Sequence, residues 1–225
     1  MNKFITYLAV VVVFFSCNYG KANSSTITSK DNDFAILPKP KPGEQVATFG
    51  GGCFWAMSEA LLELRGVSQV VSGYAGGNTK NPTYEQVCTR TTNHAETVQV
   101  YYDPKQISYE TLAEAFFYAH DPTTINRQGP DEGTDYRSIA FYRTPQEKQM
   151  LDAEIAKVNA SGHYAGKIVT QVVPFKVFYP AEKYHQGYYR LHLNDNPYLT
   201  SVSMPKIMKM RKAMKAQLKP DFQKL

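Results

Sequence analysis

Hydrophobic and polar residues alternate along residues 95–102 (AETVQVYY), which is the period of a half-buried β-strand. Residues 108–120 instead repeat apolar positions at helical spacing behind Ser108, a favourable N-cap. The same patterns predict strands at residues 46–49, 67–74, 138–142 and 168–177, and helices at residues 55–64, 82–88, 145–160 and 181–193. Strands and helices alternate through long, irregular connections. We therefore expect an α+β fold: a two-layer sandwich with a split β-α-β (ferredoxin-like) core and long coil segments at both ends.

Residues 1–16 follow neither pattern. A positive start at Lys3 precedes an almost wholly apolar run that closes at Ser16. The run is shorter than the ~20 apolar residues of a membrane-spanning helix, so it predicts a signal peptide and an exported protein. Cys17 follows directly, and we expect its acylation, as in bacterial lipoproteins, and a periplasmic or membrane-anchored location. Ordinary secretion is the alternative, since Phe14 stands where that lipoprotein pattern has leucine.

Three further segments follow the predicted signal peptide. Residues 17–45 are polar and then proline-rich, which predicts a flexible tether. Residues 46–200 form one domain, and residues 201–225 form a basic helical tail. One face of the tail carries apolar residues at helical spacing: Ile207, Met210, Met214 and Leu218. That face packs on the domain or, in the alternative, touches anionic lipid. The net charge of +5 is modest, and we expect a monomer without a nucleic-acid partner.

The cysteine count points to chemistry rather than to a disulfide framework. If Cys17 carries lipid, only Cys53 and Cys88 remain in the domain, too few to staple an exported protein. Cys53 follows three glycines, in GGGCFW, where a strand turns into a helix. Backbone N–H groups at a helix start stabilise a thiolate, so the turn indicates a reactive thiol. An inert buried cysteine is the alternative.

A series of motifs then identifies a family. In chain order they are GCFW, GYAGG, NPTYEQVC, HAE, HDPT, NRQG, GTDYRS and AEKYHQ. In this order they resemble the A-type peptide methionine sulfoxide reductases, over residues 46–198. The resemblance implies a catalytic domain that reduces the S epimer of methionine sulfoxide, free or in proteins, to methionine.

The resemblance also implies roles for particular residues. Cys53 is the nucleophile, which becomes a sulfenic acid, and Glu96 is the acid that protonates the leaving oxygen. The remaining residues position the substrate: Tyr84, Tyr136 and Asp131 order the sulfoxide oxygen, and Phe54 and Trp55 hold the methyl group. Taken singly, each of these residues also fits an ordinary structural role. The five histidines have no metal-ligand spacing, so we expect no metal.

The chain departs from many relatives at its C-terminal end. Leu199 and serines stand where others keep a resolving cysteine, and Cys88 is the only other thiol of the domain. Cys88 has a packing role or, alternatively, resolves the sulfenic acid. We expect no bound cofactor and an external thiol reductant, thioredoxin or a similar protein. Two other functions stay open: a thiol peroxidase, and a surface lipoprotein that binds oxidised peptides.

Overall fold

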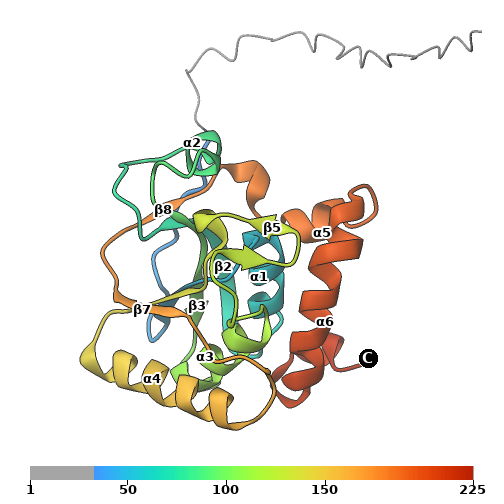
Figure 1. Ribbon diagram of the computed structural model, residues 1–225. Helices are drawn as coiled ribbons and strands as arrows, with labels where there is room; N and C mark the ends of the chain where they lie inside the picture. Colours follow the sequence, from blue (N-terminus) through green and yellow to red (C-terminus); the bar gives the residue numbers. More distant parts are fainter. Residues whose placement is uncertain (1–32, 225) are drawn as a thin grey trace, which may run out of the picture. The chain divides into compact units, whose positions relative to one another are not determined.

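A mixed six-stranded sheet forms the centre of the computed structural model, which describes residues 33–224 (Figure 1). The predicted signal peptide and Cys17 lie outside the described residues. The strands of the sheet are β1 (Gln45–Gly50), β2 (Val67–Ala75), β3 (Ala95–Tyr102), β6 (Ile139–Tyr142), β7 (Gln171–Pro174) and β8 (Phe178–Pro180). Their order is β7-β6-β1-β3-β2-β8, and every pair is antiparallel except β6 and β7.

Strand β3 lies in the middle of the sheet, between β1 and β2, and all eight of its residues are buried. Val98, Val100 and Tyr102 belong to the main hydrophobic core. Ala95 and Tyr101 belong to a smaller core, which Leu37 and Phe175 among others cover. Because strand residues alternate between the two faces, β3 is covered on both sides and any group on it lies inside the protein.

Six α-helices are described: α1 (Phe54–Leu62), α2 (Tyr84–Cys88), α3 (Tyr109–Tyr118), α4 (Pro145–Ala160), α5 (Tyr188–His192) and α6 (Met204–Ala213). The predicted cap of α3 is confirmed, because Ser108 accepts a hydrogen bond from the backbone N–H of Thr111, and Thr144 caps α4 in the same way. Two short strands, β4 (Arg127–Gln128) and β5 (Asp131–Glu132), pair with each other. A 3₁₀ turn, Thr134–Tyr136, follows them.

Two predicted elements are wrong in extent. The strand expected at residues 168–177 is only β7, because the next segment crosses to the opposite edge of the sheet, where β8 pairs with β2. The helix expected at residues 181–193 is divided into a 3₁₀ turn, Lys183–His185, and α5. Gly187 separates the two parts with φ +64°, a left-handed conformation that ends a regular helix.

The segment predicted as a tail belongs to the domain. Helix α6 packs against α1 (Figure 1), with Ile207 and Met210 buried in the main core. The Arg211 guanidinium donates hydrogen bonds of 2.5 and 2.7 Å to the buried carboxylate of Glu63 and fixes α6 on α1. Residues 33–44 of the predicted tether also lie on the domain, where the Ala35 N–H bonds the carbonyl of Ala181. Among residues 33–224, no helix is both long and apolar enough to span a bilayer.

Candidate active site

The glycine turn between β1 and α1 places Cys53 at a helix start inside the protein. Gly52 has φ +82°, which favours glycine, and a Cβ there would lie 2.6 Å from the Gln128 side chain. A Cβ on Gly51 would lie 2.7 Å from the His120 ring. Cys53 follows as the N-cap of α1, and only 7% of its surface is exposed. The absence of side chains on the turn lets these neighbours pack closely and hold Cys53 in place.

Glu96 stands on the central strand β3 and is buried. Its Oε2 accepts a hydrogen bond of 3.0 Å from the N–H of Phe54, the first residue of α1. Burial raises the pKa of Glu96 to about 8, and the nearby carboxylates of Asp135 and Asp131 act in the same direction. The Phe54 hydrogen bond opposes this rise without cancelling it. Glu96 is therefore a protonated acid at neutral pH.

A cavity of about 130 Å³ lies beside Cys53 and Glu96. Its lining residues are Cys53, Trp55, Tyr84, Glu96, Asp131, Tyr136 and Tyr198. The structure thus brings together all the residues predicted to be catalytic, and adds one of the two predicted substrate-binding aromatic residues. Burial and the neighbouring Glu96 raise the pKa of Tyr84 and of Tyr136, so both hydroxyl groups stay protonated and can donate hydrogen bonds into the cavity.

Phe54, the other predicted substrate-binding residue, is not among the lining residues. Its ring is 1% exposed and lies in the main core, 4.8 Å from the His185 ring and 5.9 Å from the Tyr74 ring between centroids. Phe54 contributes to the site through its backbone N–H on Glu96 and as packing behind Trp55.

Tyr198 is a lining residue that sequence reasoning missed. Its hydroxyl donates a hydrogen bond of 2.6 Å to Oδ2 of Asp131, and it also lowers the pKa of the nearby Cys53 thiol. The Nζ of Lys206, at the start of α6, lies 3.5 Å from the same Oδ2 and donates to the carbonyl of Gln128. The sequence signal that could have indicated Tyr198 was its position directly before Leu199, where many relatives of the resembled family keep a cysteine.

The acidity of Cys53 differs from the sequence-based expectation. Burial raises the pKa of the Cys53 thiol, and the Glu96 carboxylate adds to this effect. The backbone N–H of Trp55, at the helix start, and the hydroxyl of Tyr198 act to lower the pKa of the Cys53 thiol, but they do not outweigh burial. A resting thiol, rather than the predicted thiolate, is therefore the main form at neutral pH. The helix start was visible in the sequence, whereas the depth of burial was not.

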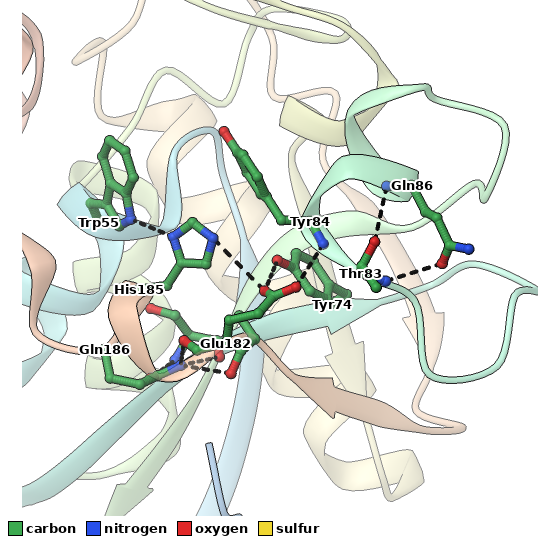
Figure 2. A network of polar contacts seen from close by, with 10 residues as sticks. Trp55, Tyr74, Thr83, Tyr84, Gln86, Glu182, His185 and Gln186 are labelled. Atoms are coloured by element: carbon green, nitrogen blue, oxygen red, sulfur yellow. Dashed lines mark hydrogen bonds and ion pairs between the residues drawn. The ribbon is translucent and has the colours of Figure 1, made fainter. Parts of the chain in front are cut away.

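Trp55 is an aromatic residue of the cavity lining, and Figure 2 shows its indole beside His185. Its indole stacks on Tyr188, with 3.9 Å between centroids and 12° between ring planes, and meets the edge of Tyr198. The indole Nε1–H donates a hydrogen bond of 3.1 Å to Nδ1 of His185. On the far side of His185, Glu182 accepts a hydrogen bond of 2.9 Å from the backbone N–H of Tyr84. Trp55 and Tyr84 are thus each hydrogen-bonded to one member of a neighbouring pair, His185 and Glu182.

Neither cysteine among residues 33–224 forms a disulfide. Cys88 is exposed at the last residue of α2, one turn after Tyr84, whose hydroxyl acts to lower the pKa of the Cys88 thiol. In the same part of the chain, no cluster of three or more histidine, cysteine, aspartate or glutamate side chains is arranged to hold a metal ion. The described site therefore consists of one buried thiol, one protonated carboxyl group and several hydroxyl donors.

Known proteins have sequences similar to that of this chain. The family model for peptide methionine sulfoxide reductase matches residues 45–218. The peptide methionine sulfoxide reductase MsrA of Haloquadratum walsbyi is 47% identical over 174 residues, which cover 77% of this chain and 98% of that relative. The MsrA of Thermus thermophilus is 46% identical over 177 residues, which cover 79% and 99%.

Solved structures agree with the sequence comparisons. Reduced Mxr1 from Saccharomyces cerevisiae superposes with a TM-score of 0.66 and 34% identity, covering 70% of this chain and 91% of that chain. Methionine sulfoxide reductase A of Corynebacterium diphtheriae superposes with a TM-score of 0.60 and 34% identity, covering 73% and 90%. The mixed α/β class of the fold is confirmed, and so is the family resemblance first found in the motifs. The chain belongs to the peptide methionine sulfoxide reductase family.

Proposed function

We propose that this protein reduces the S epimer of methionine sulfoxide, free or in proteins, to methionine and so repairs oxidative damage. One observation carries the proposal: the Cys53 thiol and the protonated Glu96 carboxyl group line one small cavity beside the indole of Trp55. A nucleophile and a proton donor on the same cavity are what oxygen transfer from a sulfoxide requires.

The chemistry follows from these groups. The sulfur of Cys53 attacks the sulfoxide sulfur as a thiolate, while Glu96 gives its proton to the sulfoxide oxygen. An S–S bond forms between Cys53 and the substrate as the S–O bond breaks, and the oxygen leaves as hydroxide. The hydroxide then attacks the sulfur of Cys53, the S–S bond breaks with its electron pair on the product methionine, and Cys53 becomes a sulfenic acid. The proton that left the thiol restores Glu96, so no net proton is consumed. Methionine sulfoxide is reduced by two electrons and Cys53 is oxidised by two.

The cavity walls orient the substrate in this proposal. The hydroxyls of Tyr84 and Tyr136 donate to the sulfoxide oxygen, and the Asp131 carboxylate orders the site through Tyr198. The indole of Trp55 contacts the methyl group. An aromatic–sulfur contact contributes only ~1 kcal/mol, so orientation of the sulfur toward Cys53 is its larger effect.

The sulfenic acid is reduced by an external thiol protein of the thioredoxin type, with no bound cofactor. The first thiol forms a mixed disulfide with Cys53 and releases water, and a second thiol frees Cys53. Leu199 is fully buried at the position where many relatives keep a cysteine, which supports direct reduction by the partner. Cys88 as a resolving residue is the alternative.

We also propose that the protein is an exported monomer, anchored through a lipid on Cys17. The sequence pattern of residues 1–17 supports this location. For the fold, the strand order β6-β1-β3-β2 with α1 and α3 as crossovers supports the split β-α-β (ferredoxin-like) interpretation.

The test is turnover of the separated S and R epimers of a methionine sulfoxide peptide, with dithiothreitol as reductant. Cys53→Ser and Cys88→Ser are assayed beside the unchanged protein. We expect turnover of the S epimer alone, abolished by the first substitution and retained by the second. Turnover of neither epimer would overturn the proposal. Consumption of hydrogen peroxide in that case would favour a thiol peroxidase, and binding of the peptide without reaction would favour a binding protein.

A further inference from the structure

The AEKYHQ motif, residues 181–186, takes no part in the proposed chemistry, yet it lies directly behind the cavity. Glu182 in this motif has a side chain that is 12% exposed. Its Oε2 accepts a hydrogen bond of 3.0 Å from the hydroxyl of Tyr74, and its Oε1 accepts one of 2.9 Å from the backbone N–H of Tyr84 (Figure 2). A partly buried carboxylate is costly unless it is hydrogen-bonded, and these two partners from β2 and α2 hold it in a fixed position.

His185 lies between this carboxylate and the indole. Its ring is 1% exposed, and burial lowers its pKa to about 4, so it is neutral at physiological pH. Because an indole N–H can only donate, Nδ1 of His185 is the acceptor for Trp55, and the ring proton lies on Nε2. That nitrogen lies 3.8 Å from Oε2 of Glu182 and has no hydrogen-bond partner among the described residues. The proton on Nε2 therefore faces the carboxylate.

The two cavity walls next to Glu182 and His185 come from separate helices. Trp55 stands on α1 and Tyr84 begins α2, and both line the cavity. The ring of His185 also packs between them, 5.8 Å from the Trp55 ring and 4.7 Å from the Tyr84 ring between centroids. No direct hydrogen bond joins the side chains of Trp55 and Tyr84 in the described part of the chain. Their spacing depends on Glu182 and His185.

We propose that Glu182 and His185 are positioning residues. They set the indole of Trp55 against the hydroxyl of Tyr84, so that the methyl group and the oxygen of the sulfoxide are fixed at the same time. The inference rests on the proposed function, in which those two groups are held by these two walls. Neither residue touches the reacting atoms. Each acts through a wall residue of the cavity.

The experiment compares Glu182→Gln with Glu85→Gln. The control removes the same charge from an exposed residue adjacent to Tyr84, whose side chain has no hydrogen-bond partner among the described residues. Two quantities are measured: kcat and KM for the S epimer, and the emission spectrum of Trp55, the only tryptophan in the chain. His185→Asn is the second variant, because its amide oxygen can replace Nδ1 while the link to Glu182 is lost.

We expect Glu182→Gln to lower kcat/KM by about 30-fold, mainly through kcat, because a small misplacement of a positioned substrate costs that much. The Trp55 emission maximum should shift as well, and Glu85→Gln should change neither quantity. A Glu182→Gln enzyme that is folded and within twofold of the control would overturn the inference. If that variant fails to fold, His185→Asn decides, and full activity there overturns the inference equally.

Failure of the proposed function has a different signature. In that case the unchanged protein turns over neither epimer, whereas the emission of Trp55 still reports whether Glu182 controls the indole. An unshifted emission in both Glu182→Gln and His185→Asn would overturn the positioning role independently of any activity.

Discussion

The two cysteines of the domain stand at opposite ends of two helices and have different surroundings. Cys53 precedes the first residue of α1, is 7% exposed and lines the cavity with Glu96. Cys88 is the last residue of α2 and is exposed. Burial raises the pKa of both thiols, and a nearby tyrosine hydroxyl opposes the rise in each case, Tyr198 for Cys53 and Tyr84 for Cys88. Acidity therefore does not distinguish the two thiols, and in the proposed mechanism Cys53 is the nucleophile because it lies beside the proton donor Glu96.

Removal of the proton donor beside Cys53 should have the largest effect on the rate of the reaction. Glu96→Gln keeps the shape of the side chain but has no acidic proton, and general acid catalysis contributes about 10²–10⁴-fold. We expect the rate of methionine formation in a single turnover, without reductant, to fall by about 10³-fold. Glu85→Gln serves as the control, because it also removes a carboxyl group, but from an exposed position on α2. A decrease of less than threefold in Glu96→Gln would show that another group protonates the oxygen.

The second test uses the pH dependence of kcat/KM, which reports the ionisation of the free enzyme. The reactive form needs a thiolate on Cys53 and a proton on Glu96. Below pH 8, Glu96 is protonated and the thiolate fraction rises tenfold per pH unit. Above the Glu96 pKa of about 8, each gain in thiolate is cancelled by loss of the Glu96 proton, so log kcat/KM should rise and then level off near pH 8.

In Glu96→Gln that break should be absent, and kcat/KM should continue to rise above pH 8 because the Cys53 thiol has a raised pKa. A break at the same pH in both proteins would assign it to another group. Glu96 would then not be the acid of the reaction.

Much of the site was predictable because its residues lie in short, continuous motifs. The glycine turn, Cys53, Glu96, Tyr84 and Tyr136 each stand in a recognisable stretch, and the local helix patterns placed the starts of α3 and α4 correctly. The order of the strands was not predictable from these patterns, because periodicity gives the face of a strand and not its neighbour. Residues 168–177 illustrate this: a single apolar run precedes a crossing from one sheet edge to the other.

Long-range contacts account for what was missed. Tyr198 and Lys206 reach Asp131 only because the Arg211–Glu63 pair and the buried face of α6 fix the C-terminal segment on α1. The state of the Cys53 thiol depends in the same way on packing, since burial opposes the helix start. The helix start, which lowers the pKa of Cys53, was visible in the local sequence. The larger desolvation, which raises this pKa, was not.

A smaller effect is expected for Tyr198→Phe. The substitution removes the hydroxyl that stabilises the Cys53 thiolate and holds Asp131, and a hydrogen bond to a charged group contributes about 1.5–3 kcal/mol. We expect kcat/KM to fall by about tenfold and alkylation of Cys53 by iodoacetamide to slow by a similar factor. Alkylation of Cys88, followed by peptide mass mapping in the same sample, is the internal control and should not change. Equal rates for Cys53 in both proteins would contradict the assigned role of Tyr198.

Cys88→Ser should have the smallest effect, because the residue is exposed at the end of a five-residue helix and an exposed substitution changes stability by within about 0.5 kcal/mol. Urea unfolding and single-turnover oxygen transfer should both match the unchanged protein. Multiple turnover with thioredoxin distinguishes the two roles left open for this thiol. If Cys88 resolved the sulfenic acid, this substitution would stop the cycle after one methionine per enzyme while leaving the first turnover intact. Continued turnover at an unchanged rate would mean that the reductant attacks Cys53 directly.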